Sequence, residues 1–299
     1  MNGSCGLWLA PLRGVTVRTF RAVFGEAIRE AGFAGMYAPF IPANAGFRFS
    51  ERIFSDILPG DGAHGRDVAP LPLVPQVIGK DPDALREWCK AVKDLGYLRV
   101  DLNAGCPFPM IRRKGRGSGL LRTPDVLDRM LEAGCDEMGP GGFSLKTRLG
   151  LERPDELLAL MDMINRYPLA VIAVHARTAV QMYGGATDKA AFCAVRDAAT
   201  VPVMYNGDAA VGDSFQSDGV MVGRRFICDI ANRADARDLF LRYLEESRRE
   251  LCGDTPVLGR MKELLSYWCL EPQWRHLWPS VKICRTVDEM HMLSLRLMP

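Results

Sequence analysis

The chain has 299 residues, which is long enough for one large domain with a smaller appendage. Hydrophobic residues make up 48% of it, charged residues 25%, and the formal net charge is +2, as in an ordinary soluble globular protein. Any nucleic-acid partner must therefore bind a local basic patch, because the charge of the whole chain is close to neutral.

The 9 cysteines are scattered singly along the sequence. Cys-x-x-Cys pairs and histidines at metal-ligand spacing are lacking, so the sequence supports neither a metal site nor a disulfide framework and predicts a reduced protein in the cytoplasm. The first residues lack the apolar run and the cleavage site of a signal peptide, and we expect no transmembrane segment.

Short apolar runs alternate with amphipathic stretches and with Gly or Pro breaks, which is the pattern of a parallel α/β fold. Eight such runs predict a closed (β/α)8 barrel, that is, a TIM barrel. The expected strands are 7–10, 35–38, 73–78, 98–102, 143–147, 171–175, 201–205 and 219–222.

Three good helices are expected between these strands. One covers 81–95, with Asp81 as its cap and Pro82 in its first turn, the second covers 124–132 with Thr123 as its cap, and the third covers 154–167. Residues 41–72 are rich in Gly, Pro, Asp and Arg and predict a long excursion, while 208–219 are too few for a normal crossover helix.

The pattern becomes helical after residue 235, where apolar residues recur at helical spacing and no strand signal returns. We therefore expect a barrel domain over 1–234 and a separate helical domain over 235–299. A monomer is expected, because the helical domain already covers one side of the barrel.

Polar or glycine residues follow nearly every expected strand, and a TIM barrel keeps its chemistry at the carboxyl ends of its strands. Gly207 and Gly223 would let a phosphate approach the backbone, and Arg224 would add charge. Lys146 and His175, on adjacent strands, would face the electron-rich edge of a flavin. The strand-end residues are Pro11, Leu12, Gln76, Asn103, Cys106, Lys146, Arg148, His175, Arg177, Asn206, Gly207, Asp208, Gly223 and Arg224.

Cys106 is the one cysteine placed like a reagent, because residues 100–107 read VDLNAGCP, a strand that runs into a polar turn carrying this cysteine, with a basic, glycine-rich loop close behind. This position predicts an exposed thiol at the carboxyl end of a strand. An unperturbed thiol, with a pKa of about 8.5, is largely protonated at neutral pH and suits a general acid. The remaining cysteines are interpreted as small buried hydrophobes.

A series of motifs runs through the first three quarters of the chain: LAPLRGVTVRTFR at 9–21, PQVIGKDP at 75–82, DLNAGCPFPMIRRKGRGSGLLRTP at 101–124, LKTRLG at 145–150, VHARTAVQMYGGATD at 174–188, VPVMYNGD at 201–208 and DGVMVGRR at 218–225. In this order they resemble the tRNA-dihydrouridine synthases, a flavoenzyme family that reduces uridine in tRNA. The resemblance rests on the whole series of motifs and not on any one of them.

The resemblance implies that NADPH reduces a bound FMN, that the flavin delivers hydride to carbon 6 of uracil, and that a cysteine protonates carbon 5. Cys106 would be that acid, while Asn103 and Arg177 would bind the target base. The flavin would contact Pro11, Leu12, Gln76, Lys146, His175, Asn206, Gly207, Asp208, Gly223 and Arg224.

A uridine in folded RNA must be drawn out of its stack to be reduced, so the mouth of the barrel needs a clamp for the RNA backbone. Arg112, Arg113, Lys114 and Arg116 would supply that clamp, and the glycines at 115, 117 and 119 would let the loop move. Taken alone, such a basic run is often only a solvated loop. The helical region resembles the family's tRNA-binding domain in position and length.

The sequence departs from the family pattern at several positions. The usual Met-Glu pair is Leu12-Arg13, the usual aspartate is Val17, and the usual tryptophan is Lys189; the segment 209–218 is also short. These changes bear on flavin affinity and on the RNA partner.

Two other hypotheses remain open at this point. One is an FMN barrel that acts on a small pyrimidine, as dihydroorotate dehydrogenases do; the basic loop and the helical extension argue against it. The other is a catalytically silent RNA-binding relative, which would be colourless. Trp268, Trp274 and Trp278 are interpreted as core residues and not as base-stacking platforms.

Overall fold

A computed structural model describes residues 6–58 and 71–297. The chain divides into two compact units, and each is described by itself. The first comprises 6–11, 34–58 and 72–222 and holds the strands; the second comprises 12–33, residue 71 and 223–297 and is built from helices. Whether 235–299 fold as a domain of their own stays a prediction.

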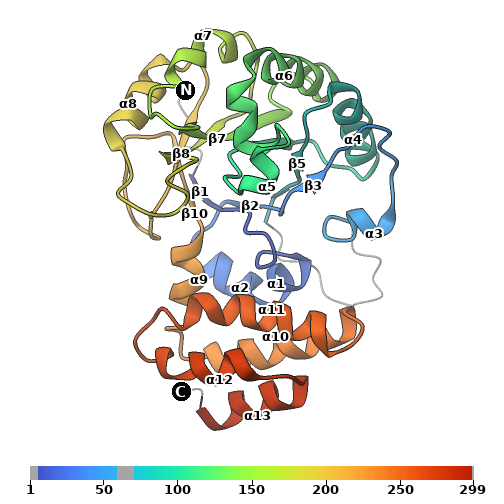
Figure 1. Ribbon diagram of the computed structural model, residues 1–299, viewed down its shortest axis with the longest axis vertical. Helices are drawn as coiled ribbons and strands as arrows, with labels where there is room; N and C mark the ends of the chain where they lie inside the picture. The colour runs from blue at the N-terminus through green and yellow to red at the C-terminus, as the bar shows by residue number, and fades with distance from the viewer. Residues whose placement is uncertain (1–5, 59–70, 298–299) are drawn as a thin grey trace. The chain divides into compact units, whose positions relative to one another are not determined.

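The ten parallel strands close into a barrel with eight strand positions (Figure 1). Two positions are each made of two short strands, because β2 (Gly35–Tyr37) continues into β3 (Ile41–Pro42), and β4 (Leu73–Val74) continues past Pro75 into β5 (Gln76–Ile78). β2 pairs with β4 and β3 with β5, and this contact closes the ring. The other strands are β1 (Gly6–Leu9), β6 (Val100–Ala104), β7 (Phe143–Gly150), β8 (Ile172–Thr178), β9 (Val203–Asn206) and β10 (Gly219–Val222), and β10 pairs with β1. The predicted TIM barrel is confirmed.

The inside of the barrel changes from apolar to polar along the strands. One cluster of buried apolar residues includes Trp8, Tyr37, Met204 and Met221. Since alternate residues of a strand face the same side, the residue two positions after Met204 is the polar Asn206, which shares its side of the sheet. The apolar layer therefore supports a polar layer nearer the carboxyl ends.

Helices cover the outside of the barrel (Figure 1). α4 (Pro82–Asp94) begins as predicted, because the Asp81 carboxylate accepts hydrogen bonds from the Asp83 and Ala84 amides. α6 (Pro124–Met138) also begins after Thr123, but the Thr123 side chain makes no capping hydrogen bond. α8 (Lys189–Ala198) is capped by Asp188.

The helix expected over 154–167 is much shorter than predicted. Only the single turns η2 (Leu158–Leu160) and α7 (Met161–Ile164) form there. The Glu156 carboxylate accepts hydrogen bonds from the Leu151 and Arg153 amides, at 2.5 and 3.1 Å, and so winds the preceding residues into a loop.

Two regions, 41–72 and 208–219, were expected to be irregular, and most of their described residues are. The excursion after β3 contains only α3 (Glu51–Phe54) before residue 59, and residues 59–70 lie outside the described part. Between β9 and β10, residues 207–218 form turns and bends and no helix, as their short length predicted.

The second unit has an aromatic core. Phe20 stacks on Phe24 at 4.4 Å between ring centroids, and Tyr243 meets the edge of both. Trp268 and Trp274 are fully buried, and Trp274 Nε1 donates to the Ala231 carbonyl at 2.8 Å. These two tryptophans are core residues, as predicted, while Trp278 is half-buried.

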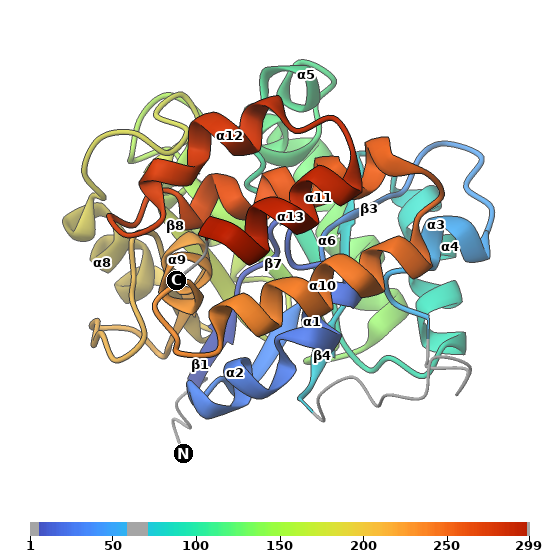
Figure 2. The ribbon, with the colours of Figure 1, turned by 90° about the horizontal axis from the view of Figure 1, so that it is seen from below.

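The helices of this unit pack through that core, and Figure 2 shows the long ones side by side. They are α1 (Arg18–Val23), α2 (Gly25–Glu30), α9 (Arg224–Ile230), α10 (Ala236–Glu250), α11 (Asp254–Trp268), η3 (Arg275–Leu277), α12 (Trp278–Ile283) and α13 (Val287–Leu297). Among the described residues, none of the helices has the length and apolar character needed to cross a membrane.

Candidate functional site

Polar side chains of neighbouring strands lie side by side near the carboxyl ends of the barrel strands. Gln76 of β5 is in register with Asp101 of β6, and Asp101 is in register with Ser144 of β7. One step further along, Asn103 is in register with Lys146. The predicted convergence of strand-end residues is therefore present in this unit.

A chain of hydrogen bonds joins β5 and β6 to the loop that carries Cys106. Gln76 Nε2 donates to Asp101 Oδ2 at 2.6 Å, and Asn103 Nδ2 donates to Gln76 Oε1 at 2.8 Å. Asn103 Oδ1 then accepts from the backbone amides of Gly105, at 3.2 Å, and Cys106, at 2.9 Å. Asn103 thus shapes the turn that positions Cys106.

Asp101 anchors this chain and is fully buried. Loss of solvation raises the pKa of its carboxyl to about 6, although hydrogen bonds from Gln76 and Ser144 and the charge of Lys146 act in the opposite direction. Ser144 Oγ donates to Asp101 Oδ1 at 2.8 Å. The sequence analysis missed Asp101 and Ser144, because a polar residue within an apolar strand gives only a weak signal. The signal that could have found them is their position in register on neighbouring strands.

Lys146 lies on β7, where its Nζ donates to Asn206 Oδ1 at 2.9 Å. Asn206 Nδ2 donates in turn to the Met221 carbonyl at 2.7 Å. Burial, together with the nearby Arg148, lowers the pKa of Lys146 to about 8, although Asp101 acts in the opposite direction. A partly desolvated ammonium of this kind attracts an acceptor that carries negative charge.

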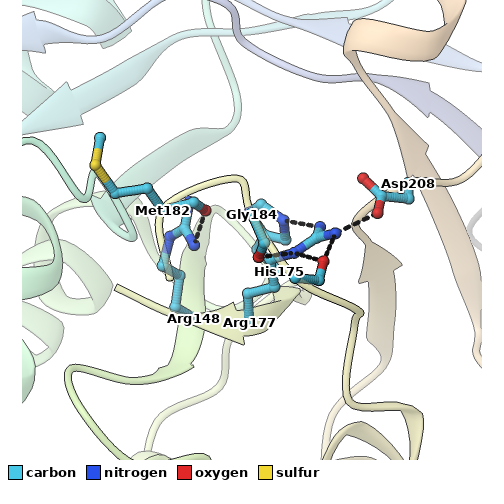
Figure 3. Close-up of polar contacts among 7 residues, drawn as sticks. Arg148, His175, Arg177, Met182, Gly184 and Asp208 are labelled. Atoms are coloured by element: carbon cyan, nitrogen blue, oxygen red, sulfur yellow. Dashed lines mark hydrogen bonds and ion pairs between the residues drawn. The ribbon is translucent and has the colours of Figure 1, made fainter. Parts of the chain in front are cut away.

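Arg177 holds a loop against His175 and Asp208 (Figure 3). Its guanidinium donates to the Gly184 and Gly185 carbonyls and forms an ion pair with Asp208. Arg177 Nη1 also lies 3.3 Å from His175 Nε2. A guanidinium only donates, so this contact makes Nε2 the acceptor and leaves the proton of a neutral His175 on Nδ1.

Arg148 holds a second part of the same loop and is almost fully buried. It donates from Nε to the Gly105 carbonyl at 2.9 Å and from Nη1 to the Thr178 carbonyl at 2.9 Å. Nη1 also donates to the Met182 carbonyl, at 2.7 Å, and Figure 3 draws this third bond. The Gly105 carbonyl belongs to the residue before Cys106. Arg148 therefore ties the turn that carries Cys106 to the loop after β8, a role that the sequence did not reveal.

The prediction of an exposed thiol at Cys106 is wrong, because the residue is only 7% exposed. Residues 117–120 cover it: the Ser118 amide and hydroxyl donate to the Cys106 carbonyl at 3.1 and 2.9 Å. A Cβ on Gly117 would lie 2.8 Å from the Cys106 Cβ. Of the other described cysteines, Cys252 is exposed and Cys193 half-buried, so these two are not buried hydrophobes; Cys5 lies outside the described residues.

The basic loop after Cys106 begins with the single turn α5 (Pro109–Arg112) and ends in η1 (Gly117–Arg122). Arg113 and Lys114 are exposed, whereas Arg112 and Arg116 are half-buried. The glycines of this loop were expected to provide motion. That motion stays a prediction, and Gly117 and Gly119 also serve close packing, since a Cβ on Gly119 would lie 2.5 Å from the Arg112 carbonyl oxygen.

The residues predicted to bind the flavin phosphate include Gly207, Asp208, Gly223 and Arg224. Gly207 has φ +126°, and a Cβ there would lie 2.9 Å from the His175 ring, so His175 packing requires this glycine. Asp208 contacts Arg177, and a contact between Asp208 and a flavin phosphate stays a prediction. Gly223 is the N-cap of α9 and Arg224 its first residue.

Two predicted flavin contacts follow β1. Pro11 ends the first segment of the barrel unit, and Leu12 begins the first segment of the helical unit. The Leu12 amide donates to Thr16 Oγ1 at 2.8 Å, which fixes the turn before α1. Their contacts with a flavin stay predictions, as do those of the other site residues.

The departures from the family pattern fall in two places. Arg13 and Val17 line a cavity of about 460 Å³ in the helical unit, together with Arg260 and Glu263. In the barrel unit, Lys189 Nζ lies 5.5 Å from the centre of the Phe215 ring, which stacks on Tyr205 at 3.8 Å. Lys189 thus contacts the short 209–218 segment, so these two departures adjoin one another.

The basic residues of the helical unit are largely engaged with their own neighbours. Arg248 pairs with Asp288, Arg249 with Glu245, and Arg260 with Glu250. Lys262 donates to the Lys282 and Cys284 carbonyls, and the other basic residues of the expected RNA-binding region include Lys282 and Arg285. In the part of the chain that the structure describes, no group of three His, Cys, Asp or Glu residues could hold a metal ion.

Residues 8–227 match the sequence profile described as "Dihydrouridine synthase (Dus)". The chain belongs to the dihydrouridine synthase family. Curated relatives of this family member include a probable tRNA-dihydrouridine synthase from Rhodobacter capsulatus, 35% identical over 52% of this chain and 50% of its own length. The tRNA-dihydrouridine synthase B of Vibrio cholerae is 30% identical over 50% of this chain and 48% of its own length.

A longer match, with a probable tRNA-dihydrouridine synthase from Staphylococcus aureus, is 29% identical over 72% of this chain and 66% of the relative. The two matches named before it span only about half the length of those relatives. Among solved structures, the fold resembles morphinone reductase, with a TM-score of 0.53 at 12% identity over 76% of this chain and 85% of the other. The old yellow enzyme from Trypanosoma cruzi gives 0.51 at 12% identity, over 78% and 88%.

Proposed function

We propose that this dihydrouridine synthase family member reduces uridines in tRNA to 5,6-dihydrouridine, with FMN as its flavin and NADPH as the electron donor. The observation that carries the proposal is the polar layer of the barrel, in which Asn103 shapes the Cys106 turn beside the cationic Lys146. The names of the curated relatives, which are tRNA-dihydrouridine synthases, support the same substrate.

The residues of the barrel mouth fit a flavin. The Lys146 ammonium has three N–H groups, and among the described residues only Asn206 accepts from it. Its remaining donors suit the electron-rich pyrimidine edge of FMN, and Gln76 and His175 would add contacts to the same ring. The phosphate would be held by the end of β9, with Asn206, Gly207 and Asp208, and by Gly223 and Arg224, which come directly after β10 in the sequence.

A bound, reduced FMN supplies the hydride for carbon 6 of uracil. Cys106 holds the proton that carbon 5 receives, and Asn103 and Arg177 hold the base. Burial under residues 117–120 shields the thiol from bulk water, so the proton goes to a bound base and not to solvent. Arg148 keeps the Cys106 turn in place through the Gly105 carbonyl.

The tRNA backbone would be held by the basic loop, in which Arg113 and Lys114 are exposed and Arg112 and Arg116 are half-buried. Exposed cations of this kind release counterions when they bind phosphates, which gives salt-dependent affinity. The helices of 235–299 would orient the tRNA.

The test is to incubate the purified protein with NADPH and unmodified tRNA and to measure dihydrouridine by mass spectrometry. We expect a yellow protein that forms dihydrouridine, and a colourless or weakly coloured Lys146→Met variant. Lys90→Met is the matched control, because Lys90 is exposed and its one ion pair among the described residues is with Glu87. A wild-type protein that binds flavin and leaves every uridine unreduced would refute the proposal.

A further inference from the structure

The orientation of two amide side chains is fixed from both ends of one hydrogen-bonded chain. At one end is the Asp101 carboxylate, which has only acceptors, so Gln76 must turn its Nε2 toward it. At the other end are the backbone amides of Gly105 and Cys106, which only donate, so Asn103 must turn its Oδ1 toward them. Both constraints require the same bond between the two amides, from Asn103 Nδ2 to Gln76 Oε1.

Every acceptor atom of the two amides is used within this chain. Gln76 Oε1 accepts from Asn103, and Asn103 Oδ1 accepts from two backbone amides. Each amide nitrogen uses one N–H group within this chain of hydrogen bonds and has one N–H group left. Among the described residues, neither remaining N–H has an acceptor. Asn103 retains 7% exposure, whereas Gln76 is fully buried.

We propose that Asp101 is a positioning residue that sets the polarity of this chain, so that Asn103 presents a hydrogen-bond donor to the bound ring and the site selects a ring carbonyl over a ring amino group. A uracil offers a carbonyl where a cytosine offers an amino group, so this polarity favours uracil. The assignment of the ring to the base of a tRNA rests on the proposed function, while the polarity of the chain does not.

The carboxylate of Asp101 removes the choice of orientation at the Gln76 end of the chain, as the Gly105 and Cys106 amides remove it at the Asn103 end. Ser144 Oγ donates to Asp101 Oδ1 at 2.8 Å and lies 3.2 Å from the Val100 carbonyl, and a hydroxyl can either donate or accept. An asparagine at position 101 could therefore sit in either orientation beside Ser144. With Asp101 only one arrangement satisfies every bond.

This reasoning predicts a specific rescue in a double-mutant cycle. Asn103→Asp keeps the two backbone bonds but places a second acceptor against Gln76, so that Gln76 faces a carboxylate on both sides. We expect its Tm to fall by about 5 °C or more, since an unsatisfied buried polar group in a chain of this size has an effect of this order. Asp101→Asn alone should lower Tm by much less.

In the variant with both Asp101→Asn and Asn103→Asp, the new amide can donate to Gln76, which can then donate to the new carboxylate. We expect most of the lost Tm to return. Asp101→Leu combined with Asn103→Asp is the control, because it removes the same charge and offers no donor, and it should restore less. The proposal would be overturned if the Tm losses of Asp101→Asn and Asn103→Asp simply add in their double variant. It would also be overturned if Asp101→Leu restored as much Tm to Asn103→Asp as Asp101→Asn does.

A second readout separates the polarity from simple stability. The rescued double variant presents a carboxylate where Asn103 presents an N–H, so kcat/KM with unmodified tRNA should fall about tenfold or more while Tm stays near the wild-type value. Asp101→Asn alone should also lower kcat/KM, but by less than the rescued variant does, because it frees the Gln76 end of the chain while the Gly105 and Cys106 amides still hold Asn103 Oδ1. An unchanged kcat/KM in the rescued variant would contradict the role of Asn103 as a donor.

The two proposals fail in different ways. The Tm cycle needs neither RNA nor NADPH, so rescue without any dihydrouridine formation would refute the proposed function and leave the polarity standing. Dihydrouridine formation without rescue would refute the polarity and leave the proposed function standing.

Discussion

Replacing Arg148 should damage the protein far more than replacing a typical surface arginine. Arg148→Met leaves the carbonyls of Gly105, Thr178 and Met182 without their donor in a site where Arg148 is 1% exposed. Each hydrogen bond from a charged group contributes about 1.5 to 3 kcal/mol, and partial hydration of the carbonyls reduces the sum, so we expect a loss of about 4 kcal/mol. In a chain of this size that is a fall in Tm of about 10 °C.

The assay is thermal and urea unfolding followed by circular dichroism, with Arg166→Met as the control. Arg166 is 61% exposed and pairs with Asp128 at the surface, so its loss should cost at most about 1 kcal/mol. Arg148→Lys should fall between the two, because one ammonium cannot reach all three carbonyls. Equal stability losses in Arg148→Met and Arg166→Met would refute the role assigned to Arg148.

Three further predictions concern other parts of the structure. Gly117→Ala should lower Tm and activity together, because the new Cβ would meet the Cys106 Cβ at 2.8 Å, whereas Gly139→Ala, which shares a positive φ but has open space, should lower Tm by less; a reversed order in thermal unfolding would contradict this. Burial raises the pKa of Asp101 from 3.8 to about 6, so the native state binds the proton more tightly than the unfolded state does, and Asp101 makes the unfolding free energy fall as pH rises between those values. Urea unfolding at several pH values should show that this fall is smaller in Asp101→Asn. An identical dependence of the unfolding free energy on pH in the two proteins would contradict the assignment. Trp274→Phe should destabilise the helical unit by about 1 to 2 kcal/mol through its lost indole hydrogen bond and contacts, and an unchanged urea midpoint would speak against it.

The barrel was predictable because its strands are short apolar runs separated by strong breaks, and each expected strand overlaps an observed one. The helix over 154–167 was not, because the Glu156 side chain competes for the backbone amides of 151–153. That interaction depends on the folded path of the loop and not on helical periodicity.

The site was predictable as a set of strand-end residues, since parallel strands bring their carboxyl ends together. The connections within it were not. The cover over Cys106 comes from residues 117–120. The hydrogen bonds that hold Asn103 come from the Gly105 and Cys106 amides and lead through Gln76 to Asp101. Such links depend on three-dimensional packing, which the sequence pattern around Cys106 does not encode locally.

The central claim is that Cys106, held in this polar layer, donates a proton to uracil. The most direct measurement is the rate of dihydrouridine formation on unmodified tRNA by flavin-loaded Cys106→Ala, beside Cys252→Ala as the control, because Cys252 is exposed and lies in the helical unit. The account predicts that Cys106→Ala binds flavin and tRNA normally but loses at least about a hundredfold in rate, while Cys252→Ala keeps the wild-type rate. Equal rates in the two variants would contradict it.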